Sequence, residues 1–203
     1  QNRNMSHHLV KCISLNKQYT SRKQIIQAVS DVNLHIEQNE LVLIKGRSGA
    51  GKSTLLNLMC GLIKPSRGKV MISEKNITDM DNHELSNLLL NYIGIIFQNF
   101  NLLPTYTVFE NIEIALAPKG LKKHEIEELV VPLLRQFHLE DKTNSLPSDL
   151  SIGQQQKVAI IRTLVKQPSV IFADEPTGSV DEETAGEICQ HLVYLQRKRQ
   201  ATI

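Results

Sequence analysis

Apolar residues in several parts of the chain follow the two patterns that are typical of strands. Val32, Leu34 and Ile36 alternate with polar neighbours, which predicts a half-buried antiparallel strand. Weaker strand patterns occur at residues 9–13 and 69–72. Short runs of consecutive apolar residues predict buried strands instead. Such runs occur at residues 41–44, 92–97 and 170–173.

Helical patterns dominate the middle and the end of the chain. Residues 54–60 predict a helix with Gly61 as its C-cap, and residues 81–84 have the form of another helix start. Between residues 99 and 166 the strand patterns fade, and the apolar spacing predicts further helices. Helices are expected at residues 108–116, 122–137, 152–166 and, near the end, 182–199. Pro132 lies inside the second of these and is expected to kink or split it.

The order of these elements predicts an α/β fold with a mostly helical segment inserted at about residues 99–166. A chain of 203 residues is long enough to bury a core as one domain. Its 41% hydrophobic and 22% charged residues are ordinary for a globular protein. We find no internal repeat and no linker between independent domains, so the sequence favours a single domain.

Composition and charge exclude several classes of function. A formal net charge of +2 and an aromatic content of 4% give no support for nucleic acid as a partner. No run approaches the roughly 18 apolar residues of a membrane span. Cys12, Cys60 and Cys189 are widely separated, so we expect three reduced thiols, with neither a disulfide framework nor a zinc site.

Residues 46–53 fill every fixed position of the pattern G-x-x-x-x-G-K-[ST]. Gly46, Gly49 and Gly51 allow a tight turn whose N–H groups point at phosphate oxygens. Lys52 is suited to the β- and γ-phosphates, and the Ser53 hydroxyl to Mg²⁺. Because a predicted strand precedes this loop and a predicted helix follows it, we interpret it as a nucleotide phosphate-binding loop.

Two carboxylates end the predicted strand at residues 170–173. A buried parallel strand beside the phosphate loop would bring Asp174 to the Mg²⁺ ion. Glu175 would then point toward the γ-phosphate, where a carboxylate can orient and deprotonate the attacking water. The alternative is a strand with an acidic cap, but the phosphate loop favours the catalytic interpretation.

Leu150-Ser151-Ile152-Gly153-Gln154 opens a predicted helix, and a serine hydroxyl at a helix start suits a phosphate, although serine there is usually only a cap. Together with residues 46–53 and 170–175, in this order and spacing, the segment resembles the nucleotide-binding subunits of ATP-binding cassette (ABC) transporters. The resemblance runs from about residue 9 to the end of the chain. It implies a P-loop NTPase core, a mostly parallel sheet with flanking helices, plus an antiparallel β subdomain and a helical subdomain.

The resemblance also assigns roles to isolated residues. Gln98 stands where the family has its Q-loop glutamine, which implies a part in hydrolysis and in holding Mg²⁺ together with Ser53 and Asp174. Tyr19 stands where the family places an aromatic ring against adenine. Residues 179–181 correspond to the D-loop. The expected catalytic residues are therefore Glu175, Lys52 and Gln98.

The family further implies a head-to-tail dimer, here expected to be a homodimer, with a membrane-spanning permease as its partner. One subunit would bind ATP and the other would cap the γ-phosphate through the start of its helix at residue 152. The chain would then lie at the cytoplasmic face of the cell membrane as a peripheral protein. The residues expected to bind ATP are Tyr19, Gly46, Arg47, Ser48, Gly49, Ala50, Gly51, Lys52, Ser53 and Thr54, with Ser151, Gly153 and Gln154 of the second subunit.

Within the family, residues 100–111 and 173–178 resemble subunits that serve macrolide export, lipoprotein release and antimicrobial-peptide export. Three features depart from the family pattern. Ile152 replaces a glycine and adds a β-branched side chain near the γ-phosphate, and Val180 replaces a leucine. The chain ends at Ile203, before the position of a switch histidine, so we interpret residues 1–203 as one ABC ATPase domain cut short at its C-terminal end.

Other readings remain open at this point. A soluble cassette protein that acts on ribosomes or DNA is disfavoured, because the chain has one cassette and no sustained heptads. A different phosphate-loop enzyme, such as a small-molecule kinase, leaves residues 150–154 and 179–181 unexplained. A regulatory module that binds ATP without hydrolysing it is compatible with Ile152 and with the absence of the switch histidine.

Overall fold

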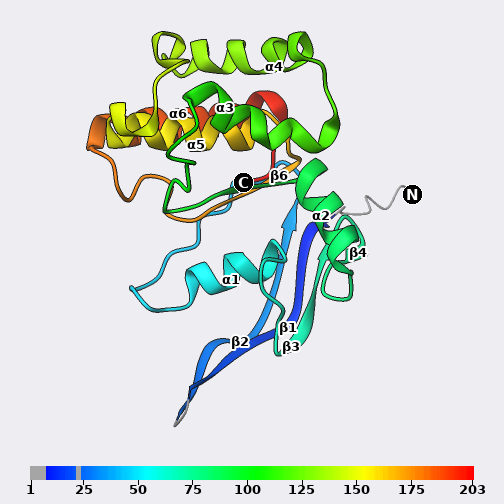
Figure 1. The fold of residues 1–203 in the computed structure, drawn as a ribbon. Coiled ribbons are helices and arrows are strands. Elements are labelled where there is room, and N and C mark those ends of the chain that lie inside the picture. The colour runs from blue at the N-terminus through cyan, green and yellow to red at the C-terminus, as the bar shows by residue number, and fades with distance from the viewer. Residues whose placement is uncertain (1–7, 22–23) are drawn as a thin grey trace. The chain divides into compact units, whose positions relative to one another are not determined.

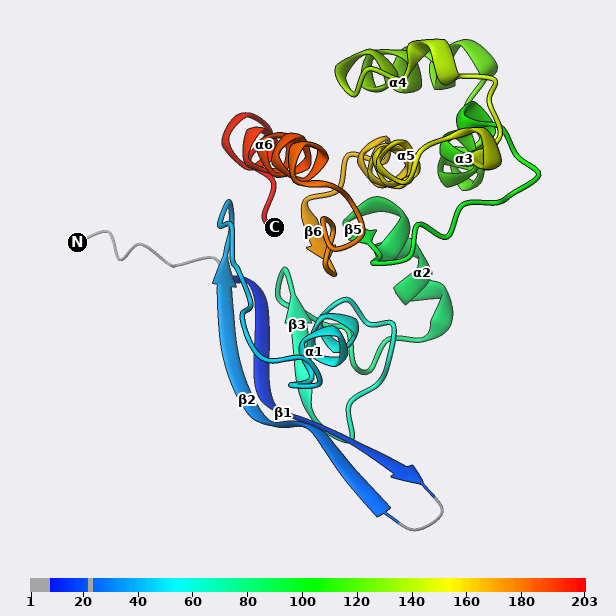
Figure 2. The same ribbon diagram turned by 90° about the vertical axis from the view of Figure 1, so that its left-hand side faces the viewer.

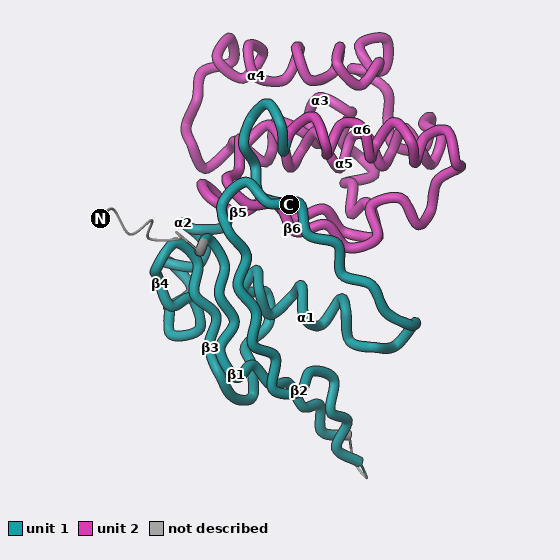
Figure 3. Tube along the Cα trace, turned by 180° about the vertical axis from the view of Figure 1, so that it is seen from behind, with its two compact units in different colours: residues 1–89, 196–203 teal, residues 90–195 magenta. Residues whose placement is uncertain are grey.

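A computed structural model of the chain describes residues 8–21 and 24–203. The chain divides into two compact units, which Figure 3 shows in different colours. Unit 1 comprises residues 1–89 and 196–203, and unit 2 comprises residues 90–195. Each unit has its own sheet, and each carries a different part of the predicted site.

Unit 1 contains a four-stranded antiparallel sheet with the strand order β2-β1-β3-β4. The strands are β1 (His8–Ser21), β2 (Gln24–Glu37), β3 (Arg67–Ile72) and β4 (Lys75–Asn76). The predicted strands at residues 9–13, 32–36 and 69–72 are thus confirmed. Figure 2 shows that β1 and β2 continue together as a long ribbon beyond the rest of the sheet.

A bend in this ribbon has an identifiable cause. Ser14 and Asp31 adopt left-handed backbone conformations, with φ of 43° and 44°. Two asparagine side chains support them, since Asn33 Oδ1 accepts from Ser14 N at 2.8 Å and Asn16 Oδ1 accepts from Asp31 N at 3.0 Å. The pairing register of β1 shifts at the same place, as expected for β-bulges.

Helix α1 (Lys52–Met59) packs against β1 and β2, as Figure 1 shows. It confirms the predicted helix but begins two residues earlier. Leu58, Met59 and Cys60 at its end are buried. Gly61 follows in the left-handed conformation that favours glycine after a helix, with φ of 80°.

The prediction of a buried strand at residues 41–44 is wrong. The structure has no strand there, and the side chains of Leu41 and Leu43 are 47% and 70% exposed. The backbone of this segment pairs with Ile203 in the part of the chain that the structure describes. Val42 N donates to Ile203 O at 2.8 Å, and Ile203 N donates to Glu40 O at 2.9 Å. One such pair is shorter than the ladder of consecutive pairs that builds a sheet.

Unit 2 contains a parallel pair of strands, β5 (Ile93–Ile96) and β6 (Val170–Ala173), both largely buried and both predicted. Figure 2 shows α5 between α6 and α3, with α4 above them. Helix α2 (Asn82–Asn91) crosses the boundary between the units. The other helical elements are α3 (Val108–Glu113), η1 (Ile114–Lys119), α4 (Lys123–Gln136), η2 (Glu140–Lys142), η3 (Pro147–Asp149), α5 (Ile152–Leu164) and α6 (Glu182–Arg199).

Pro132, which is expected to kink or split its helix, does not split it, because α4 runs unbroken from Lys123 to Gln136. Pro132 lies on the exposed side of α4, and so does Glu128, whose carbonyl loses its intrahelical donor to the proline. Water can satisfy that carbonyl. Buried residues on both sides of the proline anchor the two halves of the helix: Ile126, Val130, Leu133 and Leu134.

Two expectations from composition can be compared with the structure. Cys12 and Cys60 are buried, Cys189 is exposed, and all three are free thiols. Among the described residues, no helix combines the length and the apolar character that a bilayer crossing requires.

Candidate nucleotide-binding site

The loop at residues 46–51 leads into α1 through two glycines with left-handed conformations. Gly49 has φ of 78°, and Gly51, the N-cap of α1, has φ of 88°. At Gly51 a Cβ atom would lie 2.2 Å from the carbonyl oxygen of Ala28 in β2. Only glycine therefore allows the loop to turn this close to the sheet.

The Lys52 ammonium group is held inside this loop. Lys52 Nζ donates to the carbonyl oxygens of Gly46 and Arg47, each at 3.1 Å. The first turn of α1 contains no acidic residue, and its N-cap makes no side-chain hydrogen bond. The first N–H groups of a helix lack intrahelical partners and are therefore free to bind an anion. Here they lie beside the Lys52 cation, and the first turn adds no carboxylate that would compete for them. The arrangement suits a phosphate group.

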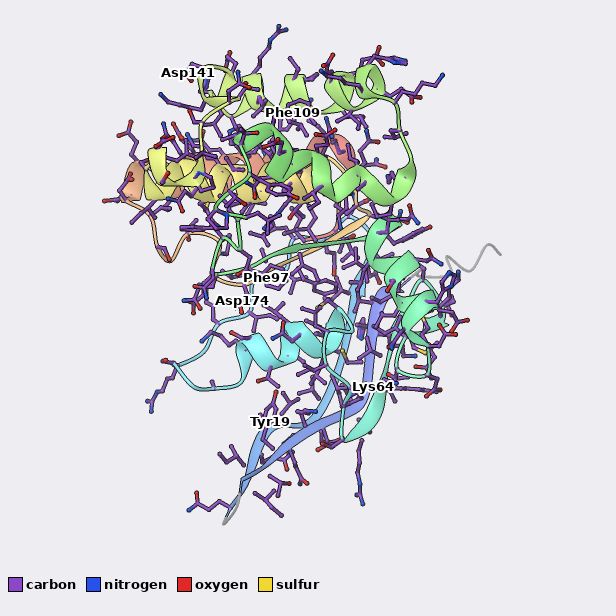
Figure 4. The ribbon with its side chains drawn as sticks, viewed as in Figure 1. Tyr19, Lys64, Phe97, Phe109, Asp141 and Asp174 are labelled. Carbon is purple, nitrogen blue, oxygen red and sulfur yellow. The ribbon has the colours of Figure 1, made fainter. Side chains whose placement is uncertain are left out.

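Asp174 and Glu175 follow directly after β6, where the parallel pairing with β5 ends. Asp174 N still donates to Ile96 O at 2.9 Å. Figure 4 labels Phe97 and Asp174 at the ends of the two strands. Because parallel strands end at the same edge of a sheet, the residues after β5 and β6 are neighbours.

This neighbourhood brings two predicted site residues into contact. Gln98 Nε2 donates to Glu175 Oε2 at 3.0 Å. Glu175 has φ of 46°, which is a left-handed conformation, and its carbonyl accepts from Gly178 N at 3.0 Å. The turn therefore fixes the backbone of Glu175, and the Gln98 amide fixes its carboxylate.

Ser151 is the N-cap of α5 and forms a reciprocal capping box with Gln154. Ser151 Oγ accepts from Gln154 N at 3.2 Å, and Gln154 Oε1 accepts from Ser151 N at 3.0 Å. Gly153 is buried, and a Cβ atom there would lie 2.9 Å from Thr184 Cγ2 of α6. Within one copy of the chain, these residues therefore have structural roles, whereas the Ile152 side chain is 55% exposed.

Tyr19 lies on β1 in the long ribbon of unit 1, where Figure 4 labels it. Its side chain is 43% exposed. Lys17 Nζ lies 5.2 Å from the centre of the ring. The ring is accessible for stacking on a base.

Asp181 of the predicted D-loop caps α6. Its carboxylate accepts from Thr184 N and from Thr184 Oγ1, both at 2.9 Å. These hydrogen bonds lower the pKa of Asp181 below its ordinary value.

Sequence reasoning missed Arg162 of α5. Its guanidinium donates to the carbonyl oxygens of Phe100 and Asn101, each at 2.7 Å, and so holds the segment that follows Gln98. Burial lowers the pKa of Arg162. The sequence feature that could have identified Arg162 is a basic residue placed between the buried positions of an amphipathic helix.

No group of three or more His, Cys, Asp or Glu side chains within residues 8–21 and 24–203 is arranged to hold a metal. The assignment of Ser53, Gln98 and Asp174 as ligands of Mg²⁺ stays a prediction. Hydroxyl, amide and carboxylate oxygens are of the kind that Mg²⁺ prefers, and this ion usually binds through one or two protein groups together with the substrate. Ser53 belongs to unit 1, whereas Gln98 and Asp174 belong to unit 2.

A family model described as ABC transporter matches residues 29–178. The chain belongs to the ABC transporter family. This ABC protein is 42% identical to the ABC transporter ATP-binding protein YtrE of Bacillus subtilis. The alignment of 181 residues covers 89% of the chain and 78% of YtrE. It is 40% identical to the methionine import ATP-binding protein MetN of Rhodopseudomonas palustris over 96% of the chain, but it spans only 53% of MetN.

Solved structures support the same assignment. A dimer of the ATP-binding cassette MJ0796, in a post-hydrolysis state with ADP and Pi, matches with a TM-score of 0.90 and 39% identity, over 95% of the ABC protein and 85% of MJ0796. CbiO1 from Clostridium perfringens, part of the transporter complex cbiONQ, matches with a TM-score of 0.83 and 30% identity, over 97% and 77% of the two chains. The predicted family, its α/β fold and its ATPase class are thus confirmed.

Proposed function

We propose that this ABC ATPase binds ATP with Mg²⁺, dimerises around the nucleotide and hydrolyses it to power an exporter or a lipoprotein-releasing transporter. The observation that carries the proposal is the position of Lys52, whose ammonium group is held by two loop carbonyls at the start of α1. A triphosphate would draw this cation to its β- and γ-oxygens. Gly46–Thr54 and the Tyr19 ring would supply the remaining contacts to the nucleotide.

We assign the hydrolysis step to Glu175, with Gln98 as its hydrogen-bond partner. Gln98 occupies Glu175 Oε2, so we assign Oε1 as the atom that takes a proton from the attacking water. Ser53, Gln98 and Asp174 would hold Mg²⁺. The ion, when bound, would neutralise charge on the phosphate oxygens.

The start of α5 would close the site of a second copy. Ser151 Oγ uses a lone pair to cap α5, but a hydroxyl also has one proton to donate. Capping is therefore compatible with a hydrogen bond from Ser151 to a γ-phosphate. Gly153 and Gln154 lie in the same turn. The dimeric structure of the relative MJ0796 supports such a homodimer.

Transport requires a membrane-spanning permease, and we place this ABC ATPase as a peripheral protein at the cytoplasmic face of the membrane. The membership of CbiO1 in a transporter complex supports a membrane partner. We treat the chain as one ATPase domain in which residues 99–166, all of whose elements are helical, form the helical subdomain that contacts the permease. We favour export or lipoprotein release over the import named for MetN. This choice rests on the resemblance of residues 100–111 and 173–178 to the subunits that serve export and lipoprotein release.

The exposed Ile152 at the start of α5 favours a second candidate, an ATP-binding regulatory subunit without hydrolysis. Measurements on three variants distinguish the two. We expect Lys52→Ala to lose ATP binding in calorimetry and ATPase activity. We expect Glu175→Gln to bind ATP, to lose hydrolysis and to elute as a dimer with ATP in size-exclusion chromatography. The control Lys75→Ala changes an exposed lysine of β4 in the same unit as Lys52.

Unimpaired ATPase activity of Lys52→Ala would contradict the assignment of the site. Binding of ATP by the unmodified protein without any turnover would favour the regulatory candidate. Elution of Glu175→Gln as a monomer with ATP would contradict ATP-driven dimerisation.

A further inference from the structure

Gln156 of α5 is a buried polar side chain to which the proposed site gives no role. Its side chain is 1% exposed. Its Nε2 donates to the carbonyl oxygen of Pro176 at 2.7 Å. Its Oε1 is also buried and accepts no hydrogen bond from any described protein group.

Chemistry fixes the orientation of this amide. A proline carbonyl can only accept, so Gln156 must present its NH₂ group to Pro176 and turn its oxygen away. A buried acceptor without a donor lowers the stability of the folded protein. An apolar side chain of similar shape would remove this unpaired acceptor, while the half-buried Pro176 carbonyl would lose its donor. The two effects oppose each other, so stability alone gives little reason for a glutamine at this position.

The carbonyl that Gln156 holds belongs to the residue after Glu175. Glu175 is left-handed, with φ of 46°, and a residue other than glycine keeps such a conformation only where its surroundings fix it. The turn that follows is closed by the hydrogen bond from Gly178 N to Glu175 O. Gly178 lies next to the carboxylate, since a Cβ atom there would be in ordinary contact with Glu175 Oε2 at 3.4 Å.

We propose that Gln156 is a positioning residue for Glu175. Its amide anchors the Pro176 carbonyl to α5, and this anchor keeps Glu175 left-handed with its carboxylate on Gln98. The inference rests on the proposed role of Glu175 in hydrolysis. It adds a fixed connection between that carboxylate and α5, the helix that Ser151 opens.

The test replaces Gln156 by methionine, which has a similar shape but no amide. We expect kcat for ATP to fall by about tenfold or more, since small displacements of reacting groups are costly. We expect KM for ATP to stay within roughly twofold, because the phosphate loop is untouched. The melting temperature should stay close to that of the unmodified protein, because removal of the unpaired Gln156 acceptor offsets the donor that the Pro176 carbonyl loses.

Gln155→Met is the matched control on the same helix. Gln155 Nε2 donates to Pro147 O and Leu150 O, at 3.1 Å and 3.2 Å, and not to the turn after Glu175. We expect its melting temperature to fall while kcat stays within roughly twofold of the unmodified protein. Hydrogen exchange at the Gly178 amide should become faster in Gln156→Met and stay unchanged in Gln155→Met.

Several results would overturn the proposal. An unchanged kcat in Gln156→Met, or a fall in kcat without faster exchange at Gly178, would do so. Should the methionine variant not fold, Gln156→Leu also removes the amide donor and is measured in the same way. Failure of both to fold would assign Gln156 a purely structural role. Full activity of Glu175→Gln would instead refute the proposed function, whatever Gln156 does.

Discussion

Replacing Asn111 by leucine tests whether one buried amide closes the loop that follows Gln98. The Asn111 side chain is fully buried. Its Oδ1 accepts from Leu103 N at 2.7 Å, and its Nδ2 donates to the carbonyl oxygens of Leu103, Tyr106 and Thr107 at 3.1, 2.8 and 3.0 Å. Asn111 thus contacts both ends of the loop from residue 103 to residue 107.

The expected loss of stability follows from the groups that leucine would leave without a partner. Leu103 O also accepts from Tyr106 N, and Thr107 O also accepts from Asn111 N. The Leu103 N–H and the Tyr106 carbonyl have no second partner among the described residues. Because Leu103 and Tyr106 are 37% and 41% exposed, water can replace part of what these two groups lose. The free energy of unfolding should therefore fall by about 1–3 kcal/mol.

Urea unfolding measures this loss. The control Asn82→Leu changes an exposed asparagine of α2 and should stay within about 0.5 kcal/mol of the unmodified protein. Asn111→Asp should lose at least as much as Asn111→Leu, because its carboxylate would face three carbonyl oxygens. If Asn111→Leu were as stable as the control, the amide would not close the loop and the reasoning would be refuted.

Two further predictions follow from other side chains. Ile152→Gly removes an exposed β-branched side chain from the start of α5. ATPase activity, measured by phosphate release, and ATP-dependent dimerisation, measured by chromatography with ATP, should rise by a few-fold, while the melting temperature falls slightly. An unchanged rate would show that Ile152 does not limit closure of the dimer. Burial, followed by the charge of Lys157, lowers the pKa of His191 below its ordinary value of 6.5, although Glu187 opposes this and His138 adds to it. The unfolded chain therefore takes up the proton first, so the free energy of unfolding should fall as the pH drops below about 6.5. His191→Phe, which keeps an aromatic ring against Phe137 at the present centroid distance of 4.1 Å, should lose less stability between about pH 7 and 5 in urea unfolding; equal losses would contradict the assignment.

Local pattern was sufficient for most of the elements that carry the candidate site, but not for residues 41–44 before the phosphate loop, where the predicted strand is absent. Apolar runs predicted β5 and β6, and parallel strands end at one edge of a sheet, which explains how Gln98 and Glu175 meet. The Ser151 cap and α5 were predicted from a hydroxyl followed by an amphipathic pattern. Each of these elements depends on residues close together in the sequence, and the rule for parallel strands then brings the two strand ends together.

Features that depend on distant neighbours could not be predicted in this way. Pro132 is tolerated because α4 is anchored by packing on both sides of it, which the local rule for proline ignores. Gly153 fills the place of a phosphate contact in the family pattern, but in this structure it also gives Thr184 room to approach α5. The hydrogen bonds of Gln156 and Arg162 to backbone carbonyls far along the chain leave no periodic mark in the sequence.

The carbonyl contacts of Gln156 and Arg162 constrain the spacing of these two residues along α5. Gln156 holds the backbone after Glu175, and Arg162 holds the backbone after Gln98, from positions six residues apart. One residue inserted between them would rotate Arg162 by about 100° around the helix axis relative to Gln156. Either the Pro176 carbonyl or the carbonyls of Phe100 and Asn101 would then lose their donor. Insertions and deletions between Gln156 and Arg162 are therefore not compatible with both contacts, whereas substitutions between them keep the spacing.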